Sequence, residues 1–382
     1  MPRPIRVAID LRPLARGPST GIGLILTQIQ EELVSRGFEF IGLSDRPLGP
    51  VSIPDSVEVR VSGGEGGRIR WEARALPRML RAIHPAPDLY HATWNHGVPA
   101  ALPFPSLLSL HDLIPWVRPD LVPWPKPAPL HRWLYRRAVT ASARNAAAIV
   151  TLSEASRRDI VERLHSASPK IEVVPCAVPR WFRPPTPEAS AGSRARFGGG
   201  PYWLYFGGFD PRKGVDLLVS AMSRAFPDPR QAPPLVLAGT VNPLAERIAR
   251  SAAERGLDVH LTGYIPDTEL SALLGGAELF LYPSRYEGFG IPPLLAMATG
   301  VPCVASDAAA IREVVGDAAL LFPSGDEAAL AALLAAVARD RSSLVPLASR
   351  GRERAARFSV EAMAERMIRA YERAASPRGG SA

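Results

Sequence analysis

The order of apolar segments is the feature that most restricts how this chain can fold. Short runs typical of buried strands alternate with stretches of helical periodicity, and the alternation occurs twice along the 382 residues. Strands that alternate with helices form parallel sheets with crossover helices. In the first half the expected strands are 4–10, 37–43, 88–92, 106–111, 146–152 and 171–175. A helix is expected at 22–36, and Gly37 should end it.

A segment rich in Pro, Gly and Ser separates the two halves. It reads "RPPTPEASAGSRARFGGG" (183–200), has few large apolar residues and is typical of a linker. After it the alternation restarts. Strands are expected at 202–207, 235–239, 259–262, 278–282 and 301–305, and helices at 214–225, 243–255, 267–275, 293–299, 326–340 and 359–375.

We therefore predict an α/β protein of two doubly wound, Rossmann-like domains that face each other across a cleft. The N-terminal domain should span 1–183, the linker 184–200 and the C-terminal domain 201–358. Residues 359–382 should form a C-terminal helix and tail that pack back on the N-terminal domain.

Composition excludes several classes of protein. A net charge of +8 would suit nucleic acid, but no zinc finger, recognition helix or aromatic platform accompanies it, so we expect no nucleic-acid partner. No apolar run is long enough for a signal peptide or a membrane span, and we expect the chain in the cytosol. Cys176 and Cys303 lie far apart outside any C-x-x-C pair and should be buried apolar residues.

One segment suggests contact with a surface. "HRWLYRRAV" (131–139) mixes arginines with Trp133 and Tyr135, as helices at the membrane interface do. It makes peripheral contact with the inner face of the membrane a hypothesis, although a solvated helix face is the favoured alternative.

Unusual residues lie where the expected strands end, which is where ligands bind in open parallel sheets. His91, His111, Gly208 and Glu287 all occupy such positions. A histidine at a strand end is often only a satisfied structural group. That interpretation is open for His111 and is preferred for His91 and His96.

The segment "SRYEGFGIPPLLAMATGVP" (284–302) indicates a phosphate site. Its prolines suit the first turn of a helix, so Gly288 and Gly290 precede a helix N-terminus, where free N–H groups and the helix dipole favour an anion. A carboxylate beside that site would repel phosphate, and Glu287 is therefore expected to accept hydrogen bonds from the hydroxyls of an attached sugar. An ordinary helix cap with turn glycines is the alternative.

A second segment, "YFGGFDPRKGVDLLVSA" (205–221), places two cations after a strand and before a helix. Arg212 and Lys213 there suit a diphosphate whose charge grows as it leaves. Only three of the 45 basic residues are lysines, so Lys213 is informative. The alternative is an exposed basic turn.

With these two segments, "VHLTGYIPDTELSALLGG", "SLHDLIPW" and "VTLSEASRRDI", the chain resembles the family 4 retaining glycosyltransferases of the GT-B fold over nearly its whole length. The resemblance implies an N-terminal domain on the acceptor side and a C-terminal domain that binds a GDP- or UDP-linked sugar. It also implies retention of anomeric configuration, a glycan or lipid-linked acceptor, no cofactor and no metal.

The resemblance also assigns residues. The catalytic positions are Glu287, which contacts the transferred sugar, Lys213, which binds the diphosphate, and His111, which faces the donor sugar from the first domain. The remaining donor-binding positions are Gly21, Gly23, Gly208, Arg212, Gly263, Tyr264, Ile265, Gly288, Phe289, Gly290, Ile291 and Leu295. The implied mechanism is front-side displacement, in which the departing phosphate helps to take the acceptor proton.

Three departures from the family pattern affect the donor site. Leu295 replaces a second glutamate that holds the ribose hydroxyls, Gly208 stands where many members have arginine, and Leu24 replaces another arginine. The leading hypothesis is a hexosyltransferase, specifically a mannosyltransferase of surface polysaccharide assembly. A catalytically weak relative that binds nucleotide sugar or a partner enzyme is the main alternative. A phosphorylase or sugar-nucleotide epimerase is opposed by the lack of an evident pyridoxal-phosphate lysine site.

Overall fold

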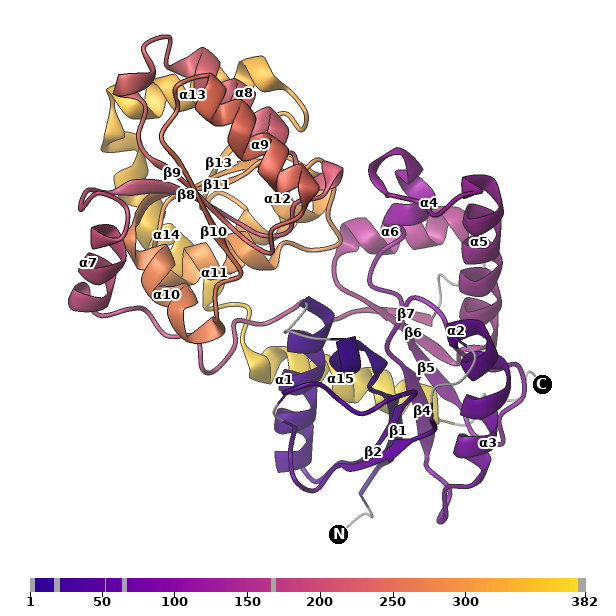
Figure 1. The fold of residues 1–382 in the computed structure, drawn as a ribbon. Coiled ribbons are helices and arrows are strands. Elements are labelled where there is room, and N and C mark those ends of the chain that lie inside the picture. Colours follow the sequence, from indigo (N-terminus) through magenta and orange to yellow (C-terminus); the bar gives the residue numbers. More distant parts are fainter. Residues whose placement is uncertain (1–3, 17–20, 52, 64–66, 166–169, 377–382) are drawn as a thin grey trace. The chain divides into compact units, whose positions relative to one another are not determined.

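The computed structural model describes residues 4–16, 21–51, 53–63, 67–165 and 170–376, which form two compact units (Figure 1). Unit 1 comprises the described residues of Met1–Val117, Trp124–Pro179 and the segment from Ser359 onward. Unit 2 comprises Arg118–Pro123 and Arg180–Phe358. Each unit contains one parallel sheet with helices on its faces, which confirms the predicted α/β class and the two doubly wound domains.

Unit 1 is built on a seven-stranded sheet of order β3-β2-β1-β4-β5-β6-β7. The strands are β1 Arg6–Asp10, β2 Glu39–Ser44, β3 Glu58–Val61, β4 Leu89–Ala92, β5 Ser106–Ser109, β6 Ala148–Thr151 and β7 Ile171–Val173. The helices are η1 Arg12–Arg16, α1 Gly21–Ser35, α2 Gly67–Arg70, the π-helix η2 Trp71–Ala75, α3 Leu76–Arg81, α4 Ile114–Val117, α5 Ala128–Asn145, α6 Glu154–Arg163 and α15 Val360–Ala375.

The centre of this sheet is buried on both faces. Every residue of β4, β5 and β6 is buried, as expected for parallel strands covered by helices on each side. On one face, residues of η2, α3 and α5 form a single apolar cluster with the strands. Helix α15 packs against α1 and against β4, β5, β6 and β7. The C-terminal helix is therefore a structural part of unit 1.

A buried polar network attaches α15 to the sheet. His91 on β4 hydrogen-bonds through Nδ1 to Tyr371 Oη at 2.9 Å and through Nε2 to Ser109 Oγ at 2.8 Å. Burial, with a smaller contribution from the neighbouring His111, lowers the pKa of His91 to about 3, so its ring is neutral at physiological pH. His91 is the satisfied structural group that the sequence suggested.

Unit 2 is built on a six-stranded parallel sheet of order β10-β9-β8-β11-β12-β13. Its strands are β8 Tyr202–Phe206, β9 Leu235–Ala238, β10 Val259–Gly263, β11 Ala277–Tyr282, β12 Cys303–Ser306 and β13 Leu320–Phe322. Its helices are η3 Pro119–Leu121, α7 Pro187–Ala195, η5 Pro211–Lys213, α8 Val215–Ala225, η6 Pro229–Gln231, α9 Pro243–Glu254, α10 Asp267–Gly276, α11 Ile291–Thr299, α12 Ala309–Val315, α13 Glu327–Arg339, η7 Arg341–Leu344 and α14 Val345–Ala355.

The expected linker 184–200 differs most from the structure. It belongs to unit 2 and contains helix α7, which packs against α10. The Thr186 hydroxyl accepts from Ala189 N at 3.2 Å and Pro187 occupies the first turn, which together favour a helix start despite the linker-like composition. A side chain at Gly275 would collide with Pro185 and Ser190, so this glycine permits the close packing.

Other expectations hold within a few residues. Helix α1 ends at Ser35, and Gly37 follows with a φ of 87°, the left-handed conformation in which glycine ends helices. Cys176 and Cys303 are free and buried, as expected. Strands β3 and β13 and helix α14 were not expected from the sequence. In the described parts of the chain, no helix combines the length and apolarity that a membrane span requires.

The network around His91 leads to a first prediction. Tyr371→Phe should lower the free energy of unfolding of unit 1 by about 1–3 kcal/mol, because Nδ1 of the buried His91 loses its partner. Denaturant unfolding measures the loss, and hydrogen exchange should locate it in α15. Tyr264→Phe, at a tyrosine that is 47% exposed, is the control and should have little effect. Equal stability of Tyr371→Phe and the wild type would contradict a structural role for this bond.

Candidate functional site

The strand order of unit 2 determines where a ligand site can form. Strand β8 lies between β9 and β11. After β8 the chain forms β9 and β10 on one side of it, and it then crosses to form β11 on the other side. In doubly wound sheets, the crevice beyond the carboxyl ends of two such strands is the usual ligand position. The loops after β8 (207–214) and after β11 (283–290) are those that carry Lys213 and Glu287.

The loop after β8 has a fixed conformation. Asp210 Oδ1 accepts from the backbone N of Arg212 at 3.2 Å and caps the short helix η5. Gly214 follows with a φ of 67°, and a Cβ there would lie 2.3 Å from the carbonyl oxygen of Pro283. Only glycine allows both the left-handed backbone and this close approach between the two loops.

Backbone contacts join the two loops directly. The backbone N of Arg285 donates to the carbonyl oxygen of Arg212 at 2.7 Å. Ser284 Oγ lies 3.2 Å from the same carbonyl oxygen. Ser306 Oγ on β12 donates in turn to the carbonyl oxygen of Ser284. The segments that contain the candidate cations and the candidate carboxylate are therefore held in register by hydrogen bonds.

The carboxylate of Glu287 lies at the centre of this arrangement. Its Oε1 accepts from Lys213 Nζ at 2.7 Å, from Tyr282 Oη at 2.8 Å and from Ser284 Oγ at 2.6 Å. Its Oε2 accepts from Arg212 Nη1. Lys213 Nζ also donates to Tyr282 Oη at 2.9 Å, which closes a ring of three polar groups. Only 9% of the Glu287 side chain is exposed.

Burial and charge act in opposite directions on these groups. Burial alone would raise the pKa of Glu287, but the charges of Lys213 and Arg212 outweigh it and lower the pKa to about 2. For Lys213, burial and the neighbouring Arg212 outweigh the attraction of Glu287 and lower its pKa. Burial and the charge of Glu287 raise the pKa of Tyr282 well above its usual value, so its hydroxyl stays protonated. Two cations thus favour the carboxylate form of Glu287, whereas burial and the second cation disfavour the charged form of Lys213.

The site retains polar groups for a ligand. An ammonium carries three N–H donors, and Lys213 uses two of them, on Glu287 and Tyr282. A carboxylate offers about four lone-pair sites, and Oε1 of Glu287 already accepts three bonds. Additional hydroxyls would therefore be accepted by Oε2. The cluster can neutralise an anionic group through Lys213 and Arg212 and accept from a hydroxyl through Glu287.

The glycines after Glu287 lead into helix α11. Gly290 is its N-cap residue, with a φ of 134° that favours glycine, and no side chain caps the helix. Phe289 is buried, and its ring packs edge-on against Phe358, so it anchors the loop to the core. Ile291 begins the helix, and the two prolines that follow have no N–H to offer. The predicted helix start is confirmed to within two residues.

Leu295 does not occupy the position that we expected. A donor-binding role requires its side chain to project from α11 toward a ligand, but the side chain is only 2% exposed and belongs to the core. An apolar side chain gains most from burial, and the residues on either side of it, Leu294 and Ala296, are fully buried as well. Leu295 presents no group to a ligand in this structure.

The remaining donor-site candidates of unit 2 are dispersed. Gly208 is exposed after β8, and its carbonyl oxygen accepts from Tyr205 Oη at 2.5 Å. Gly263 has a φ of 78° and ends β10, which lies at the edge of the sheet next to β9. Tyr264 next to it is 47% exposed, whereas Ile265 is buried. The structure brings Arg212, Lys213 and Glu287 together and leaves the 263–265 segment on a different strand.

In unit 1, His111 follows β5 and is almost fully buried. Its Nε2 lies 3.0 Å from the carbonyl oxygen of Thr93, and its backbone N donates to Asn95 Oδ1 at 2.9 Å. A carbonyl partner requires a proton on Nε2, so Nδ1 carries the free lone pair, and it has no hydrogen-bond partner in the described structure. Burial lowers the pKa of His111 to about 4, against a smaller opposing effect of the Thr93 carbonyl, and the ring is neutral.

The glycine-rich loop of unit 1 lies only partly within the described residues. Gly21 and Gly23 fall in the first turn of α1, while residues 17–20 before them are outside the described residues.

Sequence reasoning missed a buried charge network at the corresponding switch point of unit 1, between β1 and β4. Arg12, only 2% exposed, donates to both carboxylate oxygens of Asp10 and to Glu72 Oε1 at 3.0 Å. His96 Nδ1 lies 3.2 Å from Glu72 Oε2, and the Arg12 guanidinium stacks on the ring of Trp71. The signal was the charged pair in "IDLR" directly after a strand.

Two further residues of the unit 2 site were also missed. Tyr282 and Ser284 donate to Glu287, yet the sequence shows them only as part of "LYPSRYEGFG". A hydroxyl near a strand end is too common to stand out without the fold. Among the described residues, no cluster of His, Cys, Asp or Glu has the arrangement of a metal site.

Two parallel-sheet units, with an ion-pair site at a strand switch point, have the architecture of a GT-B fold. Two family models agree with this: "Glycosyltransferase Family 4" matches residues 19–180 and "Glycosyl transferases group 1" matches residues 188–357. The chain belongs to the family 4 glycosyltransferases, which confirms the resemblance of its motifs.

Curated relatives agree on the class of enzyme. The O-antigen chain mannosyltransferase B of Escherichia coli is 28% identical over 374 residues, which cover 93% of this chain and 96% of the relative. The MMP alpha-(1->4)-mannosyltransferase of Mycolicibacterium hassiacum is 33% identical over 61% of this chain and 55% of its own length. The chain spans 39% of the length of the serotype-specific mannosyltransferase WbdA of Escherichia coli, to which it is 26% identical.

Solved structures confirm the fold. Sucrose-phosphate synthase from Thermosynechococcus elongatus superposes with a TM-score of 0.76 at 22% identity, covering 96% of this chain and 98% of that one. Anabaena Alr3699/HepE, in complex with UDP and glucose, gives 0.77 at 18% identity, covering 96% and 99%.

The ion pairs of Glu287 make stability depend on pH. The folded-state pKa of Glu287 lies below its unfolded value of about 4.5. Its contribution to the free energy of unfolding is therefore present above pH 4.5 and is lost as pH falls toward 2. The advantage of the wild type over Glu287→Gln should be about 3 kcal/mol near neutral pH and should shrink steadily below pH 4.5. Denaturant unfolding at several pH values measures it. Glu246→Gln, at an exposed carboxylate on α9, controls for the loss of one charge. A difference that stays constant with pH would show that Glu287 is not held in an ion pair.

Proposed function

We propose that this glycosyltransferase moves a hexose, specifically mannose, from a GDP- or UDP-linked donor to a glycan or lipid-linked acceptor in the assembly of a surface polysaccharide. The observation that carries the proposal is the cluster of Arg212, Lys213 and Glu287 at the β8/β11 switch point. Mannosyl transfer is supported by the names of the relatives, and nucleotide-sugar binding by the neighbour solved with UDP and glucose.

In the proposed reaction the ammonium of Lys213 and the guanidinium of Arg212 face the diphosphate of the donor. The bond between the anomeric carbon and the diphosphate oxygen breaks, and that oxygen takes the electron pair. The acceptor hydroxyl attacks the same face of the sugar, and its proton passes to the departing phosphate, so the configuration is retained. Lys213 and Arg212 stabilise the negative charge that grows on the leaving group, without a metal ion.

Glu287 and His111 are proposed to bind the transferred sugar. Oε2 of Glu287 has a lone pair available beyond its bond to Arg212, and it would accept from a sugar hydroxyl. Nδ1 of His111 is a buried acceptor with no partner in the described structure, which supports a hydroxyl as its ligand. Both groups keep one protonation state near neutral pH, because their pKa values lie near 2 and 4.

Lys213→Ala tests the leaving-group role. Turnover should fall about 100-fold or more, because stabilisation of the departing diphosphate is lost. The fold should persist, because Arg212, Tyr282 and Ser284 still donate to the Glu287 carboxylate. Transfer from nucleotide sugar, followed as release of nucleoside diphosphate, measures the effect. Lys126→Ala, at an exposed lysine of unit 1, is the control. Near-normal turnover in Lys213→Ala would remove this residue from the mechanism.

Leu295 is the residue on which the alternative of a catalytically weak relative rests. The family's second glutamate is absent at this position, so a weak relative would bind nucleotide sugar poorly or leave it intact. We expect instead that a screen of nucleotide sugars finds one donor that raises the midpoint of thermal unfolding of the protein and is slowly hydrolysed. GDP-mannose is the first donor to test. Calorimetric titration of that donor gives its affinity. Binding without hydrolysis or transfer would support a binding subunit, and no binding to any donor would refute the proposed function.

A further inference from the structure

One surface of unit 1 combines positive charge with exposed apolar side chains. Helix α5 (Ala128–Asn145) packs its inner side, including Val139 and Ala143, on the apolar cluster that η2 and α3 share. Its outer side is open: Leu130 is 49% exposed, Trp133 52% and Leu134 37%. These three belong to the small set of large apolar residues that the described structure leaves exposed. Their spacing places them on one helix face.

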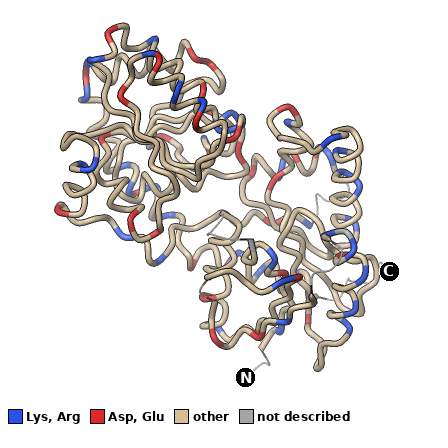
Figure 2. The backbone as a smooth tube through the Cα atoms, viewed as in Figure 1, with Lys and Arg blue, Asp and Glu red and all other residues tan. Residues whose placement is uncertain are grey.

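Helix α5 has no acidic residue. It contains four arginines, and Arg137 and Arg144 continue the face of Trp133 toward the C-terminal end of the helix. The Arg137 guanidinium lies 4.8 Å from the centre of the Trp133 ring. Figure 2 shows the blue positions that follow one another along this helix. An exposed helix that carries only positive charge and an apolar stripe has the composition of an interfacial helix.

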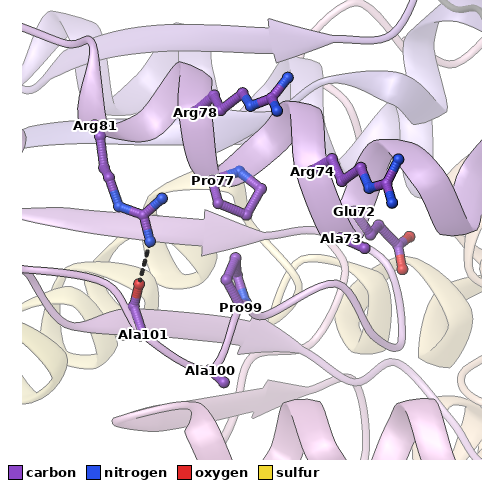
Figure 3. Close-up of a pocket in the computed structure, with 9 residues that line it drawn as sticks. All are labelled: Glu72, Ala73, Arg74, Pro77, Arg78, Arg81, Pro99, Ala100 and Ala101. Atoms are coloured by element: carbon purple, nitrogen blue, oxygen red, sulfur yellow. Dashed lines mark hydrogen bonds between the residues drawn. The ribbon is translucent and has the colours of Figure 1, made fainter.

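The segment 70–81 extends the positive charge. Arg70, Arg74, Arg78 and Arg81 are all exposed and recur at helical spacing through η2 and α3. Figure 3 shows Arg74, Arg78 and Arg81 around a pocket of about 370 Å³, with Arg81 donating to the carbonyl oxygen of Ala101. Glu72 is the acid that lines this pocket, and it is paired with Arg12 and His96. The pocket therefore presents uncompensated guanidinium groups.

The two basic segments lie beside each other. Both pack on one apolar cluster, which contains Trp71 of η2, Leu80 of α3 and Val139 of α5. The loop that lines the arginine pocket also contacts α5, since Asn145 Nδ2 donates to the carbonyl oxygen of Val98 at 3.2 Å. In the described part of the chain, no acidic side chain pairs with Arg74, Arg78 or Arg137. We call this surface the basic face and define it by Arg74, Arg78, Arg81, Trp133, Arg137 and Arg144.

We propose that the basic face binds an anionic lipid bilayer. The arginines attract the headgroup phosphates, and the arginine pocket holds one of them. Trp133, Leu130 and Leu134 enter the boundary between headgroups and acyl chains, where tryptophan is favoured. Nucleic acid would use the same charge but would leave exposed aliphatic side chains without a partner. This inference rests on the surface of unit 1 and does not depend on the transfer reaction.

Sedimentation of the full-length protein with vesicles tests the inference. The wild type should bind vesicles that contain phosphatidylglycerol and not vesicles of phosphatidylcholine alone, and added salt should weaken the binding. The double variant Arg78→Glu, Arg137→Glu should bind phosphatidylglycerol vesicles with an affinity at least about 30-fold lower than that of the wild type. The matched control is Arg247→Glu, Arg250→Glu, which reverses the same charge on the exposed side of α9 in unit 2 and should bind as the wild type does.

Two further measurements complete the design. Trp133→Ser should also reduce vesicle binding, because it removes the exposed aromatic anchor without changing charge. Circular dichroism checks that each variant folds. Equal binding by the two charge-reversal variants would overturn the inference, because attraction would then be distributed over the molecule. Binding to duplex DNA in place of vesicles would also overturn it, and would assign the arginines to nucleic acid.

Discussion

The contact on which the unit 2 site depends is the ion pair that Glu287 makes with Lys213 and Arg212. These groups come from loops that follow different strands, and the carboxylate joins them across the β8/β11 switch point. A buried carboxylate is costly unless donors surround it, and here four side chains donate to it. The site is therefore organised before any ligand arrives, which is the condition for electrostatic stabilisation of a leaving group.

The two units use the same topological position differently. In unit 2 the switch point carries partly accessible cations, with Lys213 11% and Arg212 19% exposed. In unit 1 the switch point is filled by Arg12 and Asp10, which are buried and bonded to each other. Burial lowers the pKa of Arg12, but the charge and hydrogen bonds of Asp10 outweigh it and raise the pKa above its ordinary value. The accessible network can serve a ligand, whereas the buried one is enclosed by its own unit.

Much of the fold could be predicted because each element satisfies its own local rules. Strands buried on both faces need continuous apolar runs, and helices need a period near 3.6, so both appear in the sequence. The exceptions are instructive. Helix α7 lies in a segment with a linker's composition, and it forms because Thr186 caps it and Gly275 lets it approach α10. Strand β3 at the edge of its sheet has no fully buried residue, so no apolar pattern marks it.

The sequence by itself determined the two parallel-sheet units, which follow from periodicity, and the placement of Lys213 and Glu287 after strands. Its motifs also carried the resemblance to the family. Only the tertiary structure decided what those residues contact. Tyr282 and Ser284 hold the carboxylate, Leu295 lies in the core, and His111 keeps one acceptor without a partner among the described residues. The reason is physical: burial and hydrogen-bond geometry arise between segments that are distant in the chain, and a linear pattern does not encode which side chain faces a shared crevice.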